Sequence, residues 1–285
     1  MVNKNITNSY LRILVCYYQD LFVKLDNKTY FNLHCGKADT NFELDMVADN
    51  TGDNISIRNR YWSEITGLYW AWKNLNKTNY VGLCSYRRFF NFKINPRNLI
   101  QILPLDSSDL INEIEIPNME EIFLNYDIII PKPYVYAYSI REVCKRNYRI
   151  EDFDILEKII NKISPEFDEA FISTFYNNNK LIGHNMFIMS WEHYNEFCEW
   201  VFSILFEAEK QINPLEYPIQ QVRVFGYMHE LLLQVFINKK GFRTYNSQIT
   251  WLNNENKSSR FDNIFYKLAC DFLFFFRIPV AKLLR

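Results

Sequence analysis

Short apolar runs alternate along the chain with stretches in which apolar residues recur at helical spacing. Several of the runs are continuously apolar, which is typical of strands that are covered on both faces. The predicted strands are residues 12–17, 30–35, 80–84, 127–130 and 184–189. Because helical patterns separate these strands, the order of elements favours an α/β fold with a mostly parallel central sheet flanked by helices.

Four segments carry the helical pattern, and two of them have signals at their ends. The predicted helices are residues 59–75, 152–163, 191–210 and a helix from Pro218 to about Lys240. Ser190 precedes the third helix and can cap it, and Gly241 follows the fourth and can end it. Four apolar residues of the fourth helix are predicted to face the core: Val222, Phe225, Leu232 and Phe236.

The chain has neither an internal repeat nor a linker rich in Ser, Gly or Pro, so we expect one large domain over residues 1–250. Residues 95–117 are the best candidate for an inserted loop. Residues 251–285 form a predicted C-terminal amphipathic helical appendage. Within it, residues 260–285 hold five Lys or Arg and two Asp, and residues 272–276 hold four Phe and one Leu. Such basic, aromatic stretches bind the bilayer interface, so we expect contact with a membrane surface; the alternative is a helix docked on the core.

The composition is that of a folded protein that does not bind nucleic acid. Of 285 residues, 48% are hydrophobic and 23% are charged, which excludes a disordered chain. The net charge of −1 provides no global basic field for a nucleic acid. With only 7 glycines, the chain contains neither a GxGxxG nor a GxxxxGKS/T phosphate-binding motif.

The six cysteines and the first apolar run bear on where the protein works. No cysteines form a CxxC pair, and their wide spacing without a secretory signal indicates reduced thiols. The first apolar run ends at Gln19 and Asp20 and is too short for a secretory or membrane-spanning segment. We therefore expect a cytoplasmic protein that is peripheral at the inner face of the plasma membrane.

Two adjacent arginines follow the predicted strand 80–84. Arg87 and Arg88 stand between Tyr86 and Phe89, and ligands of open α/β sheets bind at the carboxyl ends of the strands. The planar guanidinium fork suits a phosphate, and the aromatic rings suit a base or a sugar face. The alternative is a surface pair in which one arginine is bound to a carboxylate.

Two polar loops supply further candidates. Asp53 or Asn54, in a turn upstream of the first helix, is a candidate to hold a ribose or sugar hydroxyl; the alternative is an Asx turn that leads into the helix. Gly183 permits a close backbone approach just before His184 and Asn185, at the start of a predicted strand. These two side chains are candidates for binding, and a structural histidine is the alternative.

A polar stripe is predicted on the fourth helix. Its members are three or four residues apart and so share one face: Gln220, Arg223, Tyr227, Glu230 and Gln234. Tyr and Gln suit the wall of a cleft, and a solvated face is the alternative. Glu230 is the only carboxylate of the stripe and is therefore the candidate general base.

Asp152 and Asp154 match the DxD spacing of a metal motif, but they also stand at a helix start, where acidic residues interact favourably with the helix dipole. We expect the helix-start role. His34, His193 and His229 receive no metal, because no second ligand stands at a suitable spacing. We therefore expect no metal site and no cofactor, with a divalent cation at the two aspartates as the alternative.

Several sequence blocks occur in an order that resembles one protein family. The blocks are NTGDNIS (50–56), SEITGLYWAWKN (63–74), VGLCSYRRFF (81–90), YDIIIPK (126–132), GHNMFIM (183–189) and RVFGYMHE (223–230). Over about residues 10–245 the chain is similar to the glycosyltransferases encoded in bacterial capsule, exopolysaccharide and O-antigen loci. Some members are assigned as galactofuranosyltransferases that use UDP-galactofuranose. Two positions depart from the family pattern: Ser85 stands where a histidine usually precedes Tyr-Arg-Arg, and Tyr18-Gln19 stands where His-Lys usually follows the first strand.

The resemblance implies a GT-A-like fold and a nucleotide-sugar donor, with a UDP-sugar expected. In that class a DxD motif normally binds a metal that neutralises the leaving diphosphate; here Arg87 and Arg88 would replace the metal. Glu230 would deprotonate the acceptor hydroxyl in an inverting displacement. The residues implied to contact the donor are Asp53, Asn54, Glu64 and Tyr86. Those implied to contact the sugar or the acceptor are His184, Asn185, Gln220, Arg223 and Tyr227.

The leading hypothesis is a glycosyltransferase that acts on a lipid-linked or growing surface polysaccharide. The alternative is a non-catalytic carbohydrate-binding or assembly subunit of the same machinery, in which aromatic residues bind sugar and the arginine pair is structural. A sugar-phosphate transferase is less favoured, because it needs a Mg²⁺ site of clustered carboxylates. Hydrolysis of a nucleotide sugar by the purified protein separates the first two.

Overall fold

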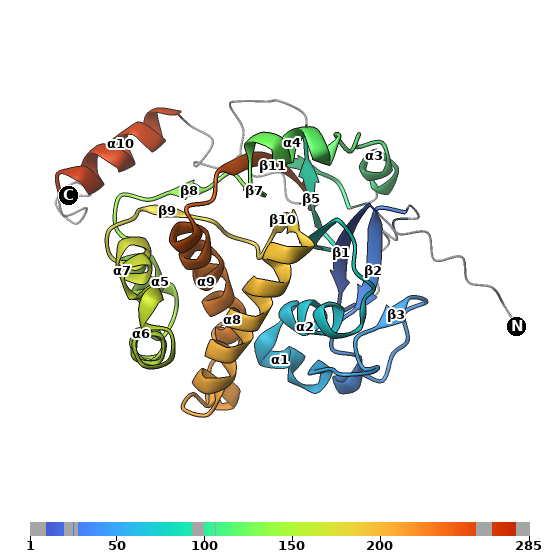
Figure 1. The fold of residues 1–285 in the computed structure, drawn as a ribbon, viewed down its shortest axis with the longest axis horizontal. Helices are drawn as coiled ribbons and strands as arrows, with labels where there is room; N and C mark the ends of the chain where they lie inside the picture. The colour runs from blue at the N-terminus through green and yellow to red at the C-terminus, as the bar shows by residue number, and fades with distance from the viewer. Residues whose placement is uncertain are drawn as a thin grey trace, which may run out of the picture.

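The computed structural model describes residues 10–19, 25, 28–92, 100–105, 107–254 and 264–277 (Figure 1). Its centre is a nine-stranded sheet, and two short strands form a second sheet. The central strands are β1 (Leu11–Tyr17), β2 (Tyr30–His34), β3 (Val47–Ala48), β4 (Tyr80–Ser85), β5 (Arg88–Asn91), β6 (Ile100–Leu103), β7 (Ile128–Pro131), β10 (Phe187–Ser190) and β11 (Thr244–Leu252). The short pair is β8 (Tyr134–Val135) and β9 (Lys180–Leu181).

The central sheet is mixed. Its order is β10-β7-β11-β5-β4-β1-β2-β3, with β6 paired to β11. The strands β2, β1 and β4 are parallel neighbours, but β10 is antiparallel to β4 and β7, and β11 is antiparallel to β5. The prediction of a mostly parallel sheet was therefore wrong. The alternation of helices and strands does not reveal the β4–β5 connection, which is so short that it can only join antiparallel strands.

Helices cover both faces of the sheet (Figure 1). On one face lie α1 (Asn59–Trp62), α2 (Ile65–Asn74), α5 (Ile140–Asn147), α6 (Ile150–Ile163), α7 (Asp168–Phe175), α8 (Trp191–Glu209) and α9 (Val224–Lys240). On the other face lie α3 (Ser108–Asn112) and α4 (Met119–Asn125). Strand β1 faces both layers: Leu14 and Cys16 belong to the core beneath α2 and α8, whereas Ile13 and Val15 belong to the core with α3 and α4. This confirms that the first apolar run is a strand buried on both faces.

The helix predicted over residues 59–75 is broken in two. Ser63, between α1 and α2, has a positive φ of 56°, which no helix accommodates. The helix predicted from Pro218 begins only at Val224, because Arg223 has a ψ of 35°, far from the helical value. The predicted ends at Ser190 and Gly241 are confirmed: Ser190 accepts a hydrogen bond from His193 N, and Gly241 ends α9 in the left-handed conformation.

The strand predicted over residues 184–189 begins only at Phe187. His184 and Asn185 have positive φ values of 76° and 52°, so they form a turn instead of extending the strand. This turn enters the site described below.

The C-terminal helix α10 (Ile264–Phe275) lies near β8 at one end of the molecule (Figure 1). Asn179 Nδ2 donates to Asp271 Oδ1 at 2.9 Å, and Cys270 is buried. The rest of the predicted appendage, residues 255–263 and 278–285, lies outside the described residues, as do residues 95–99 and 106 of the candidate insertion. All six cysteines are free thiols and buried. Among the described residues, no helix is long and apolar enough to cross a bilayer.

Candidate functional site

A cavity of about 340 Å³ opens where β1 and β4 end. The β4–β5 turn, the turn before β10, the segment between α1 and α2, and the first part of α9 all contribute to its wall. Most of the residues predicted from the sequence line it: Glu64, Tyr86, Arg87, Arg88, His184, Asn185, Arg223, Tyr227 and Glu230. Segments that are far apart in the sequence therefore converge on one cavity at the carboxyl edge of the sheet, where α/β proteins bind ligands.

The arginine pair reaches the cavity through a tight turn. Ser85 and Arg88 are paired between β4 and β5, so Tyr86 and Arg87 occupy the tip. The Arg87 guanidinium lies 5.0 Å from the Tyr86 ring centre, and the Arg88 guanidinium lies 5.0 Å from that of Trp251. Neither arginine forms an ion pair with a carboxylate within the described part of the chain, and Arg88 Nε is buried without a hydrogen-bond partner there. Two unneutralised cations that line one cavity favour an anionic ligand.

The turn at His184 and Asn185 holds two non-glycine residues in the left-handed region, which is uncommon and concentrates at functional sites. The His184 amide donates to Glu230 Oε1 at 3.0 Å, and its ring nitrogen Nε2 lies 2.7 Å from the hydroxyl of Tyr134. Burial, with a smaller effect of Arg88, lowers the pKa of His184 to about 3. The imidazole is therefore neutral at pH 7 and cannot supply a cation to the site.

Asn185 connects the opposite walls. Its Nδ2 donates to Glu64 Oε1 at 3.0 Å and to the Gly226 carbonyl oxygen at 3.2 Å. Its Oδ1 lies 2.7 Å from His229 Nδ1, so His229 donates through that nitrogen. Burial lowers the pKa of His229 to about 3, which keeps this ring neutral as well.

Glu230 is the most strongly perturbed carboxyl of the cavity. Burial is the main cause that raises its pKa to about 8, and the nearby Glu64 adds to the increase. The hydrogen bond from the His184 amide and the charge of Arg88 act in the opposite direction. A carboxyl that exchanges its proton near neutral pH fits a general base, so Glu230 is the candidate for that role.

Three predicted site residues lie away from the cavity. Asp53 accepts a hydrogen bond from the Tyr69 hydroxyl at 3.1 Å, and Asn54 Oδ1 accepts one from Ser56 N at 3.2 Å. The second contact is the Asx turn that was the alternative for this loop. Gln220 is exposed before α9, and its carbonyl oxygen accepts from the Tyr227 hydroxyl at 3.1 Å. The polar stripe predicted on this helix is therefore shorter than expected, because Gln220 and Arg223 precede the start of α9.

The DxD aspartates serve the scaffold. Asp152 is buried near the start of α6 and accepts a hydrogen bond from the Tyr217 hydroxyl at 2.9 Å. Asp154 is paired with Arg141 at 3.0 Å. Within the described ranges no cluster of three or more His, Cys, Asp or Glu could hold a metal ion.

Several lining residues were missed by the sequence analysis. Five of them are aromatic or small residues for which the sequence predicted no role: Tyr18, Ser85, Tyr134, Tyr136 and Tyr148. Tyr148 stacks on Tyr227 with ring centres 4.1 Å apart, and the Tyr86 hydroxyl donates to that of Tyr18 at 2.8 Å. Only Tyr18 and Ser85 had a signal in the sequence, because both are positions where the chain departs from the family pattern.

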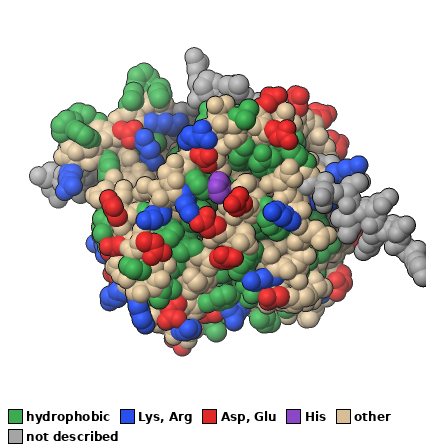
Figure 2. Space-filling model, viewed as in Figure 1, with side chains coloured by type: hydrophobic (Ala, Val, Ile, Leu, Met, Phe, Trp, Pro, Cys, Tyr) green, Lys and Arg blue, Asp and Glu red, His purple; other side chains and the backbone are tan. Residues whose placement is uncertain are grey.

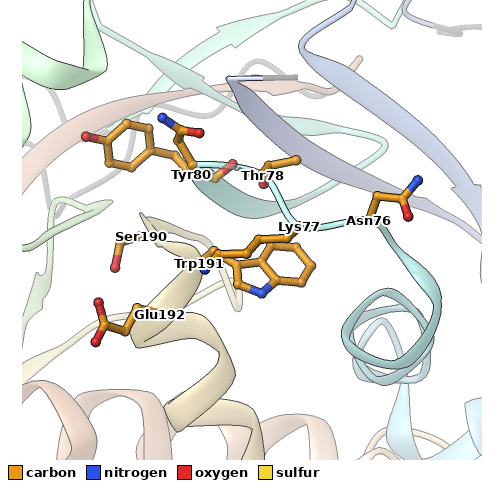
Figure 3. Close-up of a pocket in the computed structure, with 8 residues that line it drawn as sticks. Asn76, Lys77, Thr78, Tyr80, Ser190, Trp191 and Glu192 are labelled. Atoms are coloured by element: carbon orange, nitrogen blue, oxygen red, sulfur yellow. Dashed lines mark hydrogen bonds between the residues drawn. The ribbon is translucent and has the colours of Figure 1, made fainter. Parts of the chain in front are cut away.

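A larger and more open hollow lies at the other end of β4 (Figure 3). It is bordered by the loop that includes Lys77 and by the start of α8, where Trp191 and Glu192 project (Figure 3). It lies at the amino end of β4, away from the arginine pair, and none of the predicted site residues lines it. The less open cavity, at the carboxyl ends of β1 and β4, is therefore the better candidate site.

Comparisons with known proteins place the chain in a family. Residues 12–241 match the family model DUF4422, described as a domain of unknown function. The structure is similar to a solved apo structure of WbbM, a bifunctional glycosyltransferase, with a TM-score of 0.78 and 27% sequence identity. The similarity covers 86% of this chain and 46% of that one, so the chain spans about half the length of its structural relative. No curated protein matches the sequence.

Glu230→Gln should stabilise the protein at alkaline pH. The carboxyl ionises near pH 4.5 in the unfolded chain and near pH 8 in the folded protein. Between these values the folded protein binds the extra proton, so the wild-type free energy of unfolding falls as pH rises, and the loss is complete above about pH 8. Glutamine cannot ionise but can still accept the His184 N–H. Its stability advantage should therefore grow from pH 5 to pH 8, to roughly a few kcal/mol, in urea denaturation.

The matched control is Glu166→Gln, which removes an exposed carboxyl from the same protein. It should show no such growing advantage. A difference between Glu230→Gln and wild type that stays constant over this pH range would contradict the buried, proton-binding state of Glu230.

Proposed function

The chain belongs to the DUF4422 family, and on that premise we propose that it is a glycosyltransferase whose donor is a nucleotide-diphosphate sugar. The observation that carries the proposal is the pair Arg87 and Arg88, which lines the cavity without a carboxylate partner among the described residues. Two adjacent guanidinium forks fit a diphosphate. The structural likeness to a bifunctional glycosyltransferase supports the same class of reaction.

The proposed reaction is a single inverting displacement. The acceptor oxygen forms a bond to the anomeric carbon of the donor, while the bond from that carbon to the diphosphate oxygen breaks and the electron pair leaves with the diphosphate. Negative charge grows on the leaving group, and the fixed cations Arg87 and Arg88 stabilise it. The carboxylate of Glu230 takes the proton of the acceptor hydroxyl.

The family resemblance makes UDP-galactofuranose the first donor to test. We assign Tyr86 to donor binding, and His184 with Tyr227 to the sugar, because all three line the cavity. The neutral His184 ring can exchange hydrogen bonds with sugar hydroxyls without adding charge. The proposed acceptor is a lipid-linked or growing surface polysaccharide.

Helix α10 presents an apolar face that we assign to a membrane surface. Five residues of α10 and the residue that follows it are more than half exposed: Ile264, Phe265, Leu268, Phe272, Phe275 and Phe276. Figure 2 shows hydrophobic side chains gathered over α10, whereas charges of both signs are mixed over the rest of this face. Lys267 and Arg277 flank the aromatic cluster. Each basic residue near an anionic leaflet contributes roughly 1 kcal/mol, and burial of the Phe rings adds to it.

Arg87→Ala and Arg88→Ala should each lower kcat for sugar transfer by about 10²-fold, because each removes a donor that stabilises the leaving diphosphate. Lysine should restore little activity at either position, since it lacks the planar fork. The control is Arg146→Ala on α5, where the arginine is bound to Glu142. Near-normal turnover in both alanine variants would exclude the diphosphate role and favour the non-catalytic carbohydrate-binding alternative.

Transfer should persist in EDTA, because the arginine pair supplies the positive charge that a metal ion would otherwise provide. The measurement is the rate of UDP release with and without the chelator. Loss of activity that Mn²⁺ or Mg²⁺ restores would contradict the proposed mechanism and return attention to Asp152 and Asp154.

Glu230→Gln should bind the donor as wild type does but lose transfer, because the amide cannot accept the proton. In the wild type, kcat should rise with pH around the pKa of about 8 and then level off. The Glu166→Gln control should keep the wild-type profile. Wild-type kcat in Glu230→Gln would assign the base to another group.

A triple variant of α10, Phe265→Ser with Phe272→Ser and Phe275→Ser, should sediment less with anionic liposomes, and wild-type binding should weaken with salt. The control carries Ile57→Ser, Leu124→Ser and Leu215→Ser, three exposed apolar residues on other elements. Equal binding of both triple variants would disprove the membrane assignment. Loss of cooperative thermal unfolding in the α10 variant alone would also disprove it, because that result would show that these Phe side chains pack on the core of the protein.

A further inference from the structure

A second cavity, of about 330 Å³, adjoins the first. The two cavities share a wall formed by Tyr18, Asn59, Ser63, Glu64 and Arg223. Arg60, Tyr217, Ile219 and Val222 line only the second cavity. The reaction proposed above gives these four residues no role, and a donor held at Arg87 and Arg88 would occupy the other side of the shared wall.

The ring of Tyr217 is fixed in place at the second cavity. Its hydroxyl donates to Asp152 Oδ1 at 2.9 Å, and the Arg149 guanidinium lies 4.6 Å from its ring centre. A side chain that is already ordered loses little conformational entropy when a ligand packs on it. The same contact gives Oδ1 of the buried Asp152 carboxyl its hydrogen-bond partner.

Ile219 supplies an apolar surface beside this ring. It is 87% exposed, so it contributes almost nothing to the core. Binding sites for small organic groups combine apolar side chains with a few placed polar groups. An aromatic ring and an aliphatic side chain in one cavity can pack against the apolar face that the C–H groups of a sugar ring form.

Glu64 supplies the polar contact at the shared wall. Its Oε1 accepts the Asn185 amide at 3.0 Å, which fixes the carboxylate, and Oε2 accepts no hydrogen bond from the described residues. That oxygen can accept one from a sugar hydroxyl. Arg223, which lies over the Tyr18 ring at 5.5 Å, adds donors to the same wall.

We infer that the second cavity is the acceptor subsite, in which Tyr217 and Ile219 pack on the terminal sugar ring of a glycan and Glu64 orients one of its hydroxyls. The inference rests on the proposed function, because a transferase needs a second sugar site that opens into its donor site. The acceptor hydroxyl would then approach the anomeric carbon of the donor at the wall that the two cavities share.

The test measures binding of two probes, octyl β-D-galactopyranoside and octyl β-D-glucopyranoside, by saturation-transfer NMR in the presence of UDP. Ile219→Asp and Tyr217→Ala should weaken glycoside binding by at least about tenfold and leave UDP affinity unchanged. Tyr217→Phe keeps the ring but loses its hydrogen bond to Asp152, so it should bind the glycoside less tightly than wild type and more tightly than Tyr217→Ala. The control Leu215→Asp alters an exposed residue nearby that does not line the cavity, and it should change neither affinity.

Wild-type glycoside affinity in both Ile219→Asp and Tyr217→Ala would overturn the assignment. Binding of neither probe to the wild type would also overturn it, as would competition between the glycoside and UDP. The proposed function fails by a different result, which is that the wild type binds no UDP. In that case weaker glycoside binding in Ile219→Asp and Tyr217→Ala would still support a sugar-binding site in the second cavity.

Discussion

The side chain of Asn185 makes the contacts on which the shape of the cavity depends. Three hydrogen bonds, to Glu64 between α1 and α2 and to Gly226 and His229 on α9, join elements that approach from different directions. The residue is 3% exposed, and without it the fully buried His229 ring would lose its hydrogen-bond partner at Nδ1. The left-handed backbone that points the amide inward costs on the order of 1 kcal/mol, which the hydrogen bonds offset. The turn before β10 is therefore strained so that it can hold the walls of the site together.

In the part of the chain that the structure describes, the cavity holds both unpaired positive charges and a carboxyl that burial keeps protonated. Arg87 and Arg88 stand without carboxylate partners among the described residues, while Glu230 sits where burial and Glu64 favour its protonated form. Arg88 is close enough to lower the pKa of both Glu230 and His184. A diphosphate bound to Arg88 would neutralise that effect and raise the affinity of Glu230 for a proton. Donor binding and proton acceptance are thus coupled through one arginine.

The sequence predicted the cavity better than it predicted the fold. Runs of buried residues identified β1, β2 and β4, and the arginines after β4 were placed correctly because strand ends and ligand sites coincide in α/β proteins. Strand direction was missed, since local patterns do not report which distant strand becomes a neighbour. The extra lining residues Tyr134 and Tyr148 were also missed, because only tertiary folding brings them there. Asp53 and Asn54 lie outside this cavity, and the sequence could not show this, because a loop rich in polar residues has the same composition whether it binds a ligand or closes a turn.

A structure of the protein bound to UDP tests the proposed mechanism most directly. We expect the diphosphate to lie in the cavity at the end of β4, with oxygen atoms within hydrogen-bonding distance of the guanidinium groups of Arg87 and Arg88. A diphosphate bound at the hollow beside Lys77 and Trp191, or one in this cavity that contacts neither arginine, would contradict it.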